Sequence, residues 1–194
     1  MVEIFAIRHG KTHFNIKKRI MGHLDISLDT KSISEIKKVA NRLKGIHFDA
    51  IYSSDLKRAS ETGQIVRDIL NKKIPLRLSK SLREIDYGTL SGEHKELVKK
   101  KYPQYKKDAG FVHPKGESFE QAYHRIVRFI NRISKRRGSV LLVTHAGGIR
   151  AIFSYCNNQR PQENVGMKVA NDIILKCAIT KKAKKVKIVQ NTIA

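Results

Sequence analysis

Two histidines stand directly after apolar segments, and each has glycine close by. His9 belongs to RHG (8–10) after the run EIFAI (3–7), and His145 belongs to THAGG (144–148) after VLLV (140–143). Arg58 follows a third apolar segment, DAIY (49–52). A neutral imidazole can attack phosphorus, and a guanidinium matches phosphoryl oxygens with two parallel donors. These residue types would suit phosphoryl chemistry if the fold brought them together.

The elements that must position these residues alternate between strands and helices. Short β-branched and aromatic runs indicate strands, and apolar residues at helical spacing indicate helices. We expect Asp55 to cap the helix that follows it and Gly138 to end the helix before it. This alternation predicts an α/β fold with a mostly parallel sheet covered on both faces. The expected strands are 3–7, 49–52, 75–78, 140–143, 172–179 and 184–190, with a lysine-rich turn between the last two, and the expected helices are 30–43, 56–70, 118–136 and 147–155.

Ligands of open α/β sheets bind in the crevice beyond the carboxyl ends of the strands. Glycine at positions 10, 147 and 148 would let backbone N–H groups approach an anion, and the helix after Gly147 would point its amino end toward it. A protonated second imidazole could stabilise charge on the equatorial oxygens. We therefore expect one pocket to contain four side chains: Arg8, His9, Arg58 and His145.

Each of these residues also has a structural interpretation. A lone histidine is more often structural than catalytic, and Thr144-His145 could simply cap a helix. Arg58 could pair on a helix surface with Asp55 or Glu61, each three positions away. The joint placement at three strand ends favours the site over these alternatives.

Phosphoryl transfer from an ester also requires an acid to protonate the leaving alcohol. Glu84, in LREIDYG (82–88), is the best candidate because it follows an expected strand and precedes a glycine turn. Asp86 is the second candidate. Either carboxylate could instead be an exposed loop residue.

The composition bounds the class of protein. The 194 residues and 40% hydrophobic content suit a folded domain, and the net charge of +23 suggests an anionic partner. Lysines cluster at 93–107 and 181–187, although such runs are usually solvated faces. The sequence contains no zinc-finger, RNP1 or KH signature, so nucleic-acid binding rests on charge alone and is not expected.

Other features argue against alternative settings and chemistries. No apolar run is long enough to cross a bilayer, and the start of the chain does not resemble a secretion signal, so we expect a cytoplasmic protein. Cys156 and Cys177 are expected to be reduced, buried thiols. HGKTH (9–13) lacks the glutamate of HExxH, and the chain has no P-loop, no GxSxG elbow and no carboxylate cluster for a metal. We expect neither a metal nor a cofactor.

Six segments in order resemble the histidine phosphatases, also called the phosphoglycerate mutase-like superfamily. They are RHGKTHFN (8–15), GHLDISLD (22–29), IYSSDLKRASETG (51–63), LREIDYGTLSG (82–92), HPKGESFEQAYHR (113–125) and VTHAGGIRA (143–151). The resemblance implies a three-layer α/β/α sandwich and a metal-free phosphohistidine mechanism.

The resemblance also implies roles for individual residues. His9 would be the nucleophile, Glu84 the proton donor, and Arg8, Arg58 and His145 the rest of the phosphate pocket. Further phosphate contacts would come from Asn15, the Gly147 N–H and Thr12, with Glu117 in a supporting role. The chain departs from the common pattern at four positions, which bear on substrate preference: Lys11, Phe14, Ser27 and Ser32.

The resemblance favours a phosphatase over a mutase, because the stretch from Glu84 to His145 is short and the 82–92 block is similar to the phosphatase version. We expect one domain, 1–194, with a polar cap-like excursion at about 90–117 that sets substrate identity. The partners would be a small phosphorylated substrate and phosphate as product, with no membrane, in a monomer or homodimer. A mutase and a non-catalytic basic polyanion-binding module are the alternatives.

Overall fold

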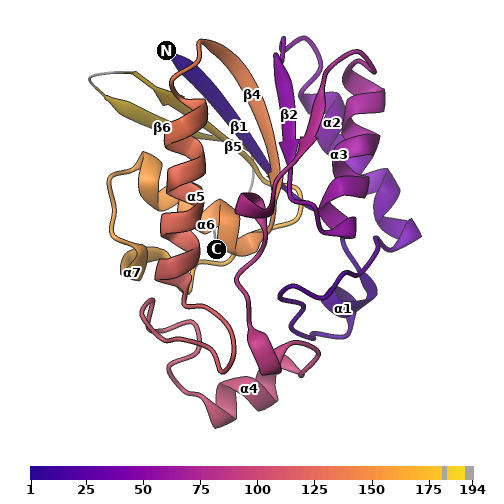
Figure 1. Ribbon diagram of the computed structural model, residues 1–194. Helices are drawn as coiled ribbons and strands as arrows, with labels where there is room; N and C mark the ends of the chain where they lie inside the picture. Colours follow the sequence, from indigo (N-terminus) through magenta and orange to yellow (C-terminus); the bar gives the residue numbers. More distant parts are fainter. Residues whose placement is uncertain (181–182, 191–194) are drawn as a thin grey trace.

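A six-stranded sheet forms the centre of the computed structural model, which describes residues 1–180 and 183–190 (Figure 1). The strand order is β3-β2-β4-β1-β5-β6. The pairs β1–β4, β2–β4 and β2–β3 are parallel, whereas β5 runs antiparallel to both β1 and β6. The mostly parallel α/β sheet is therefore confirmed. The strands are β1 (Val2–Arg8), β2 (Ala50–Ser53), β3 (Leu76–Leu78), β4 (Gly138–Thr144), β5 (Ile174–Ile179) and β6 (Lys184–Gln190).

Helices cover both faces of the sheet and complete the three layers (Figure 1). Alternate side chains of a strand point to opposite faces. Phe5 and Ile7 of β1 accordingly belong to the core beneath α2 and α3, whereas Ile4 and Ala6 belong to the core beneath α5 and α6. The helices are α1 (His13–Ile16), α2 (Ile33–Arg42), α3 (Lys57–Leu70), α4 (Lys95–Lys101), α5 (Phe119–Ile133), α6 (Ala146–Cys156) and α7 (Pro161–Asn164).

Two details of the predicted helix ends are wrong. Helix α3 begins after Leu56 without a side-chain cap, because Asp55 instead binds Arg83 through two hydrogen bonds of 2.7 and 2.6 Å. Gly138 does not end the preceding helix but begins β4 with φ of +105°. This φ is one that L side chains rarely adopt, and a Cβ would also meet the Asp49 carboxylate at 2.0 Å, so any other residue would be strained at this position.

The excursion at 90–117 lies beyond the carboxyl ends of the parallel strands, on the same end of the molecule as α1 (Figure 1). It carries the short helix α4 and an aromatic group that includes Tyr105, Phe111 and His113. An isolated β-bridge joins Arg19 to His94, and the Ile20 N–H donates to the Glu93 carbonyl at 2.9 Å. These bonds attach the excursion to the loop that follows α1.

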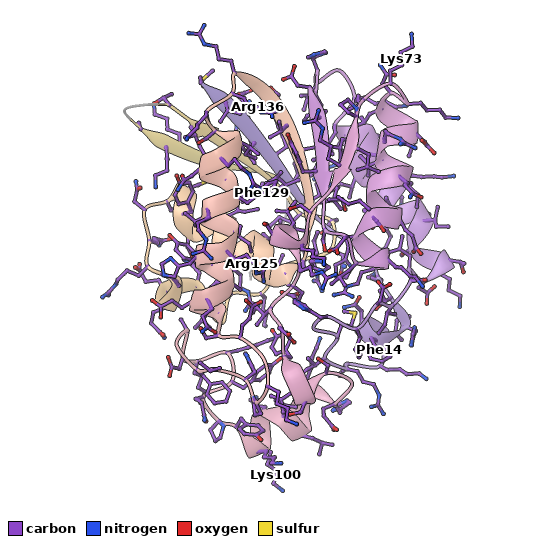
Figure 2. The ribbon with its side chains drawn as sticks, in the orientation of Figure 1. Phe14, Lys73, Lys100, Arg125, Phe129 and Arg136 are labelled. Carbon is purple, nitrogen blue, oxygen red and sulfur yellow. A yellow bond between two sulfur atoms is a disulfide. The ribbon has the colours of Figure 1, made fainter. Side chains whose placement is uncertain are left out.

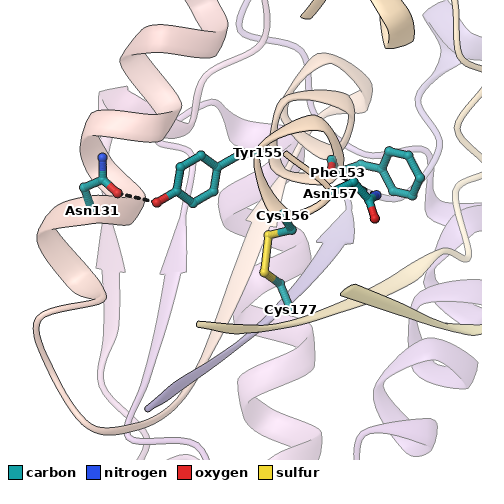
Figure 3. Close-up of a disulfide and its surroundings, with 6 residues drawn as sticks. All are labelled: Asn131, Phe153, Tyr155, Cys156, Asn157 and Cys177. Atoms are coloured by element: carbon teal, nitrogen blue, oxygen red, sulfur yellow. Dashed lines mark hydrogen bonds between the residues drawn. A yellow bond between two sulfur atoms is a disulfide. The ribbon is translucent and has the colours of Figure 1, made fainter. Parts of the chain in front are cut away.

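The two cysteines form a disulfide, which corrects the expectation of reduced thiols. Cys156 lies at the end of α6 and Cys177 lies on β5 directly beneath it (Figure 3). The burial was anticipated, since both side chains are at most 1% exposed. The pairing was not, because the contact depends on how α6 packs across β5 and no spacing motif records it.

Lys181 and Lys182, which belong to the predicted lysine-rich turn, lie outside the described residues. Among the residues that are described, no helix combines the length and the apolar character needed to cross a bilayer.

Candidate active site

Neighbouring strands bring His9 and His145 together. Arg8 at the end of β1 is in register with Thr144 at the end of β4, and the His9 N–H donates to the Thr144 carbonyl at 2.9 Å. The two imidazole rings are 5.0 Å apart between centroids. His9 is 1% exposed and His145 is fully buried. Parallel pairing of two strand ends therefore places both predicted histidines in one spot.

His9 has the protonation state that a nucleophile needs. Its Nδ1 lies 2.7 Å from the Gly10 carbonyl, which can only accept, so Nδ1 carries the proton and Nε2 keeps its lone pair. Burial, together with the charges of Arg58 and Arg8, holds the pKa of His9 well below its ordinary value. The ring is thus neutral at pH 7, with Nε2 available for bond formation.

Arg58 points inward from the first turn of α3 and is fully buried. Its guanidinium donates to the carbonyls of Leu24 at 2.7 Å and Gly22 at 2.8 Å. The alternative of surface pairing with Asp55 or Glu61 does not occur, since Asp55 binds Arg83 and Glu61 accepts from the Leu28 N–H. Burial lowers the pKa of Arg58 to about 10, which leaves it cationic at neutral pH.

Several buried nitrogens of this cluster have no protein partner. Of the six such side-chain atoms among the described residues, four belong here: Arg8 Nε, Arg58 Nε, and Nδ1 and Nε2 of His145. Buried polar atoms are nearly always hydrogen-bonded, so this concentration indicates a place for a polar ligand. Burial and the charge of Arg58 also lower the pKa of His145 well below its ordinary value. A bound dianion would oppose that effect and favour the protonated ring.

Glu84 lies at the edge of the same cluster. Its Oε1 accepts from the Gly147 N–H at 2.9 Å and from the Ile85 N–H at 3.0 Å. The carboxylate therefore lies against the amino end of α6, one residue beyond the start of that helix. Asp86, the second acid candidate, instead accepts from the Gly88 N–H and lies 3.6 Å from His23.

Arg125 fixes the backbone that carries Glu84. This arginine lies on α5, near the carboxyl ends of the strands (Figure 2). It donates to the carbonyls of Ser81, Arg83 and Glu84 at 3.0 to 3.2 Å. Its partner carboxylate, Glu117, lies 2.5 Å from the guanidinium and also accepts from the Asp86 N–H at 3.0 Å. Glu117 therefore binds both Arg125 and the Asp86 backbone, and its supporting role in the site stays a prediction.

The three predicted phosphate contacts are differently placed. Thr12 is buried, and its hydroxyl caps α1 and donates to the Asn15 Oδ1 at 3.1 Å. Asn15 lines the cavity beside Arg8. The Gly147 N–H is donated to Glu84 in this structure. Asn15 is therefore open to a ligand, Thr12 orients Asn15, and the Gly147 amide could reach phosphate only after Glu84 moved.

A cavity of about 230 Å³ opens next to the cluster. Arg8, Glu84 and Ala146 line it, whereas His9, Arg58 and His145 are buried and are not among its lining residues. Sequence reasoning assigned no role to Arg125 or Arg150, although each falls within a quoted segment. In the sequence, each of these arginines stands next to apolar residues of a predicted helix, and this pattern could have indicated a partly buried cationic side chain. The cavity lining comprises Arg8, Asn15, Arg19, Ile20, Met21, Gly22, Glu84, Tyr87, Lys95, Tyr105, Lys106, Ala146, Arg150, Gly166, Met167, Lys168 and Val169.

Residues 4–192 match the family model of the histidine phosphatase superfamily (branch 1). The chain belongs to this superfamily. Among curated histidine phosphatase relatives, phosphoglycerate mutase-like protein 4 of Arabidopsis thaliana is 33% identical over 178 residues, which cover 87% of this chain and 76% of that protein. Phosphoserine phosphatase 1 of Hydrogenobacter thermophilus is 31% identical over 160 residues, covering 79% of this chain and 75% of that protein.

Solved histidine phosphatase structures share the fold. A mycobacterial glucosyl-3-phosphoglycerate phosphatase superposes with a TM-score of 0.86 at 21% identity, over 96% of this chain and 97% of that one. The alpha-ribazole phosphatase from Shigella flexneri gives a TM-score of 0.84 at 22% identity, over 96% and 95%. The resemblance inferred from the motifs and the three-layer fold are both confirmed. The chain is thus a member of an enzyme family in which phosphatases and phosphoglycerate mutases both occur.

Proposed function

We propose that this chain hydrolyses small phosphomonoesters through a phosphohistidine at His9. The observation that carries the proposal is the pair of buried imidazoles 5.0 Å apart, beside arginine and histidine nitrogens that have no protein partner. A phosphoryl group has the charge and the acceptor oxygens to satisfy these donors. The relatives that are phosphatases also suggest hydrolase activity for this chain.

In the first step, the Nε2 lone pair of His9 forms a bond to phosphorus while the ester P–O bond breaks. The electron pair of that bond goes to the leaving oxygen, which takes a proton from the carboxylic acid form of Glu84. Arg8, Arg58 and a protonated His145 stabilise the charge on the equatorial oxygens. The Gly10 carbonyl, 2.7 Å from Nδ1, stabilises the positive charge that develops on the phosphorylated ring.

In the second step, the Glu84 carboxylate takes a proton from a water molecule whose oxygen attacks phosphorus. The N–P bond breaks, its electron pair returns to Nε2, and inorganic phosphate leaves. The backbone N–H groups of Ile85 and Gly147 hold the carboxylate in place between the two steps. We favour water over a second alcohol as acceptor, since the open cavity beside Glu84 lets water enter.

The direct test is to trap the protein during turnover and locate the phosphoryl group. The wild type should release phosphate from p-nitrophenyl phosphate in the presence of chelator and should give acid-labile phosphate on His9. His9→Ala should lose both the turnover and the label. Release without any N–P linkage would refute the mechanism, and polyanion binding without release would support the basic binding module instead.

We propose that residues 1–194 form a single domain, and limited proteolysis should therefore produce no stable fragment. We further propose a monomer or a homodimer, and light scattering distinguishes these two states. We also propose that the protein is located in the cytoplasm, although disulfides are uncommon in reducing compartments. Fractionation of cells, with thiol counting of the native protein, tests the location and the state of Cys156 and Cys177 together.

A further inference from the structure

Three arginines gather around a pair of aromatic side chains between β3 and α5. Arg77 of β3 and Arg136, which follows α5, donate to the same Tyr52 phenol oxygen at 3.3 and 3.4 Å. The Arg132 guanidinium lies 5.3 Å from the centre of the Phe129 ring. That ring meets the Tyr52 ring edge-on, with 5.4 Å between their centres. We call the three arginines the arginine cluster.

No ion pair with a carboxylate balances the charge of the arginine cluster in the described part of the chain. The sequence contains neither Asp nor Glu from 121 to 162. Two carboxylates belong to the starts of β1 and β2, and both are engaged elsewhere. Glu3 lies 2.6 Å from the Lys176 ammonium, and Asp49 accepts from the Ser139 N–H at 2.8 Å.

A structural role explains only part of this arrangement. The carboxyl end of a helix favours cations, which accounts for Arg132 and Arg136. It does not account for Arg77, which comes from an edge strand and meets Arg136 although like charges repel. The aromatic side chains beneath are buried, at 7% exposed for Tyr52 and 4% for Phe129, whereas all three arginines are exposed. The fold therefore holds three cations together where an anion from solvent can reach them.

The donors of the arginine cluster suit phosphate groups. A guanidinium presents planar, paired donors that match phosphoryl oxygens, and two guanidiniums on one phenol oxygen can share one phosphate. Arg128 is also exposed and lies one turn before Arg132 on the same side of α5. Positions one turn apart are separated by about 6 Å along a helix. This row of cations matches a partner that presents several phosphates in series, as a nucleic-acid backbone does.

Two observations favour a duplex among phosphate-rich partners. Proteins that bind single strands stack the bases on accessible aromatic rings, but Tyr52 and Phe129 are buried. Helices that bind lipid surfaces insert large apolar side chains, and α5 exposes none among its described residues. Leu78 of β3 is exposed, but it points to the same side as Leu76, which packs in the core beneath α2 and α3.

We propose that Arg77, Arg132 and Arg136 bind the sugar–phosphate backbone of a nucleic-acid duplex without reading its base sequence. None of the three lines the cavity beside Glu84. Arg136 lies beyond the carboxyl end of α5, whereas Arg125, which donates to the Glu84 carbonyl, lies nearer the other end (Figure 2). The surface could therefore hold the protein on a duplex while the cavity stays open. This inference does not depend on the proposed function.

Fluorescence anisotropy with a short labelled DNA duplex that lacks terminal phosphates tests the proposal. The wild type should bind it, and the logarithm of the association constant should fall linearly with the logarithm of the salt concentration. Arg77→Gln/Arg132→Gln/Arg136→Gln should weaken binding at least about tenfold at low salt and reduce the steepness of this line by about two to three. Wild-type affinity and steepness in this variant would refute the proposal.

The matched control is Lys37→Gln/Lys38→Gln/Lys44→Gln, which removes the same charge from the opposite face of the sheet. These lysines are exposed, lie on α2 or shortly after it, and form no ion pair with a described carboxylate. The control should stay within about threefold of the wild-type affinity, because salt screens charges beyond about 10 Å. Equal losses in the two triple variants would mean that only net charge matters, which overturns the site.

Tyr52→Phe separates the assembled cluster from its charge. The change removes the oxygen that Arg77 and Arg136 share, and it leaves every charge and both rings in place. We expect the duplex affinity to fall at least about threefold, as for a lost hydrogen bond. Unchanged affinity would refute the assembled site. Circular dichroism checks that each variant is folded. Cosedimentation of the wild type with phosphatidylserine vesicles, without duplex binding, would identify a membrane surface and overturn the proposal.

Discussion

The backbone N–H of Gly147 donates a 2.9 Å hydrogen bond to Oε1 of Glu84, which couples the amino end of α6 to this carboxylate. The approach depends on glycine, because a Cβ at 147 would meet the same Oε1 at 2.3 Å and the Ile85 side chain at 3.0 Å. Glycine at position 147 therefore permits the close approach between the Glu84 carboxylate and the amino end of α6.

Glu84→Gln should lower kcat for an alkyl phosphate by about 10²- to 10⁴-fold, because the amide cannot deliver a proton to the leaving oxygen. The loss should be much smaller for p-nitrophenyl phosphate, whose phenolate leaves without protonation. Steady-state kinetics with both esters measure the difference. Asp86→Asn is the matched comparison, and the acid assignment moves to Asp86 if that variant shows the leaving-group dependence and Glu84→Gln does not.

Gly147→Ala should displace the Glu84 carboxylate without removing it. The added methyl group would overlap Oε1, so the acid must shift while His9 and Arg58 stay in place. We expect kcat for alkyl phosphates to fall at least about tenfold, with phosphohistidine still formed from p-nitrophenyl phosphate. Wild-type kinetics in Gly147→Ala would show that the close approach is unimportant. Gly45→Ala is a control of a different kind, since nothing lies within 4 Å of a Cβ there, and only its positive φ makes alanine unfavourable.

Arg125→Lys should act on catalysis only through Glu84. A lysine cannot reproduce the planar set of donors that Arg125 directs at three backbone carbonyls and Glu117. We expect a leaving-group dependence similar in sign to that of Glu84→Gln, with the pH profile of kcat displaced. Arg128→Lys, at an exposed position of α5, should leave both readouts as in the wild type. A loss of stability alone, with normal kinetics in the folded fraction, would contradict the positioning role.

The order of elements and the histidine cluster followed from the sequence because each depends on local pattern plus one topological rule. His9 and His145 end apolar strands, and adjacent parallel strands end at the same edge. The interactions that involve Arg125, Arg150 and Cys177 could not be predicted in this way, because they depend on how α5 and α6 pack over the sheet. Asp55 illustrates the same limit, since its local helix-capping preference was overridden by a distant partner, Arg83.

Stability should fall in acid because of the buried imidazoles. Burial and the charge of Arg58 lower the pKa of both His9 and His145 in the folded chain, whereas in the unfolded chain each binds a proton near pH 6.5. The unfolded state therefore binds more protons, and the free energy of unfolding decreases as pH falls below about 6.5. Each histidine contributes roughly 1 kcal/mol per pH unit below that point.

Chemical denaturation at pH 7.5 and 5.5 checks this pH dependence. His9→Gln should lose less stability between the two values than the wild type does, by about 1 kcal/mol. The exposed His13→Gln should behave as the wild type. An identical loss in the wild type and His9→Gln would mean that His9 takes up its proton in the folded state. Added phosphate should raise the melting temperature of the wild type, because a ligand that binds the folded state stabilises it.

The disulfide should be worth about 3 kcal/mol of stability if it acts by closing a loop of this length in the unfolded chain. Its cysteines are 21 positions apart in sequence. Dithiothreitol should lower the denaturation midpoint of the wild type, whereas Cys156→Ala/Cys177→Ala should start lower and not respond. Two free thiols per native chain, counted under denaturing and non-reducing conditions, would show that the pair is not oxidised.

The two outer strands of the sheet are unattractive templates for another chain. Strand β3 is three residues long and carries Arg77, and β6 bears Lys184, Lys185 and Lys187. Short edges and lysines oppose the addition of a foreign strand, because its backbone would have to approach like charges or find few bonding groups. Part of the basicity of the chain thus opposes edge-to-edge aggregation and disfavours the association of two copies through a continuous sheet.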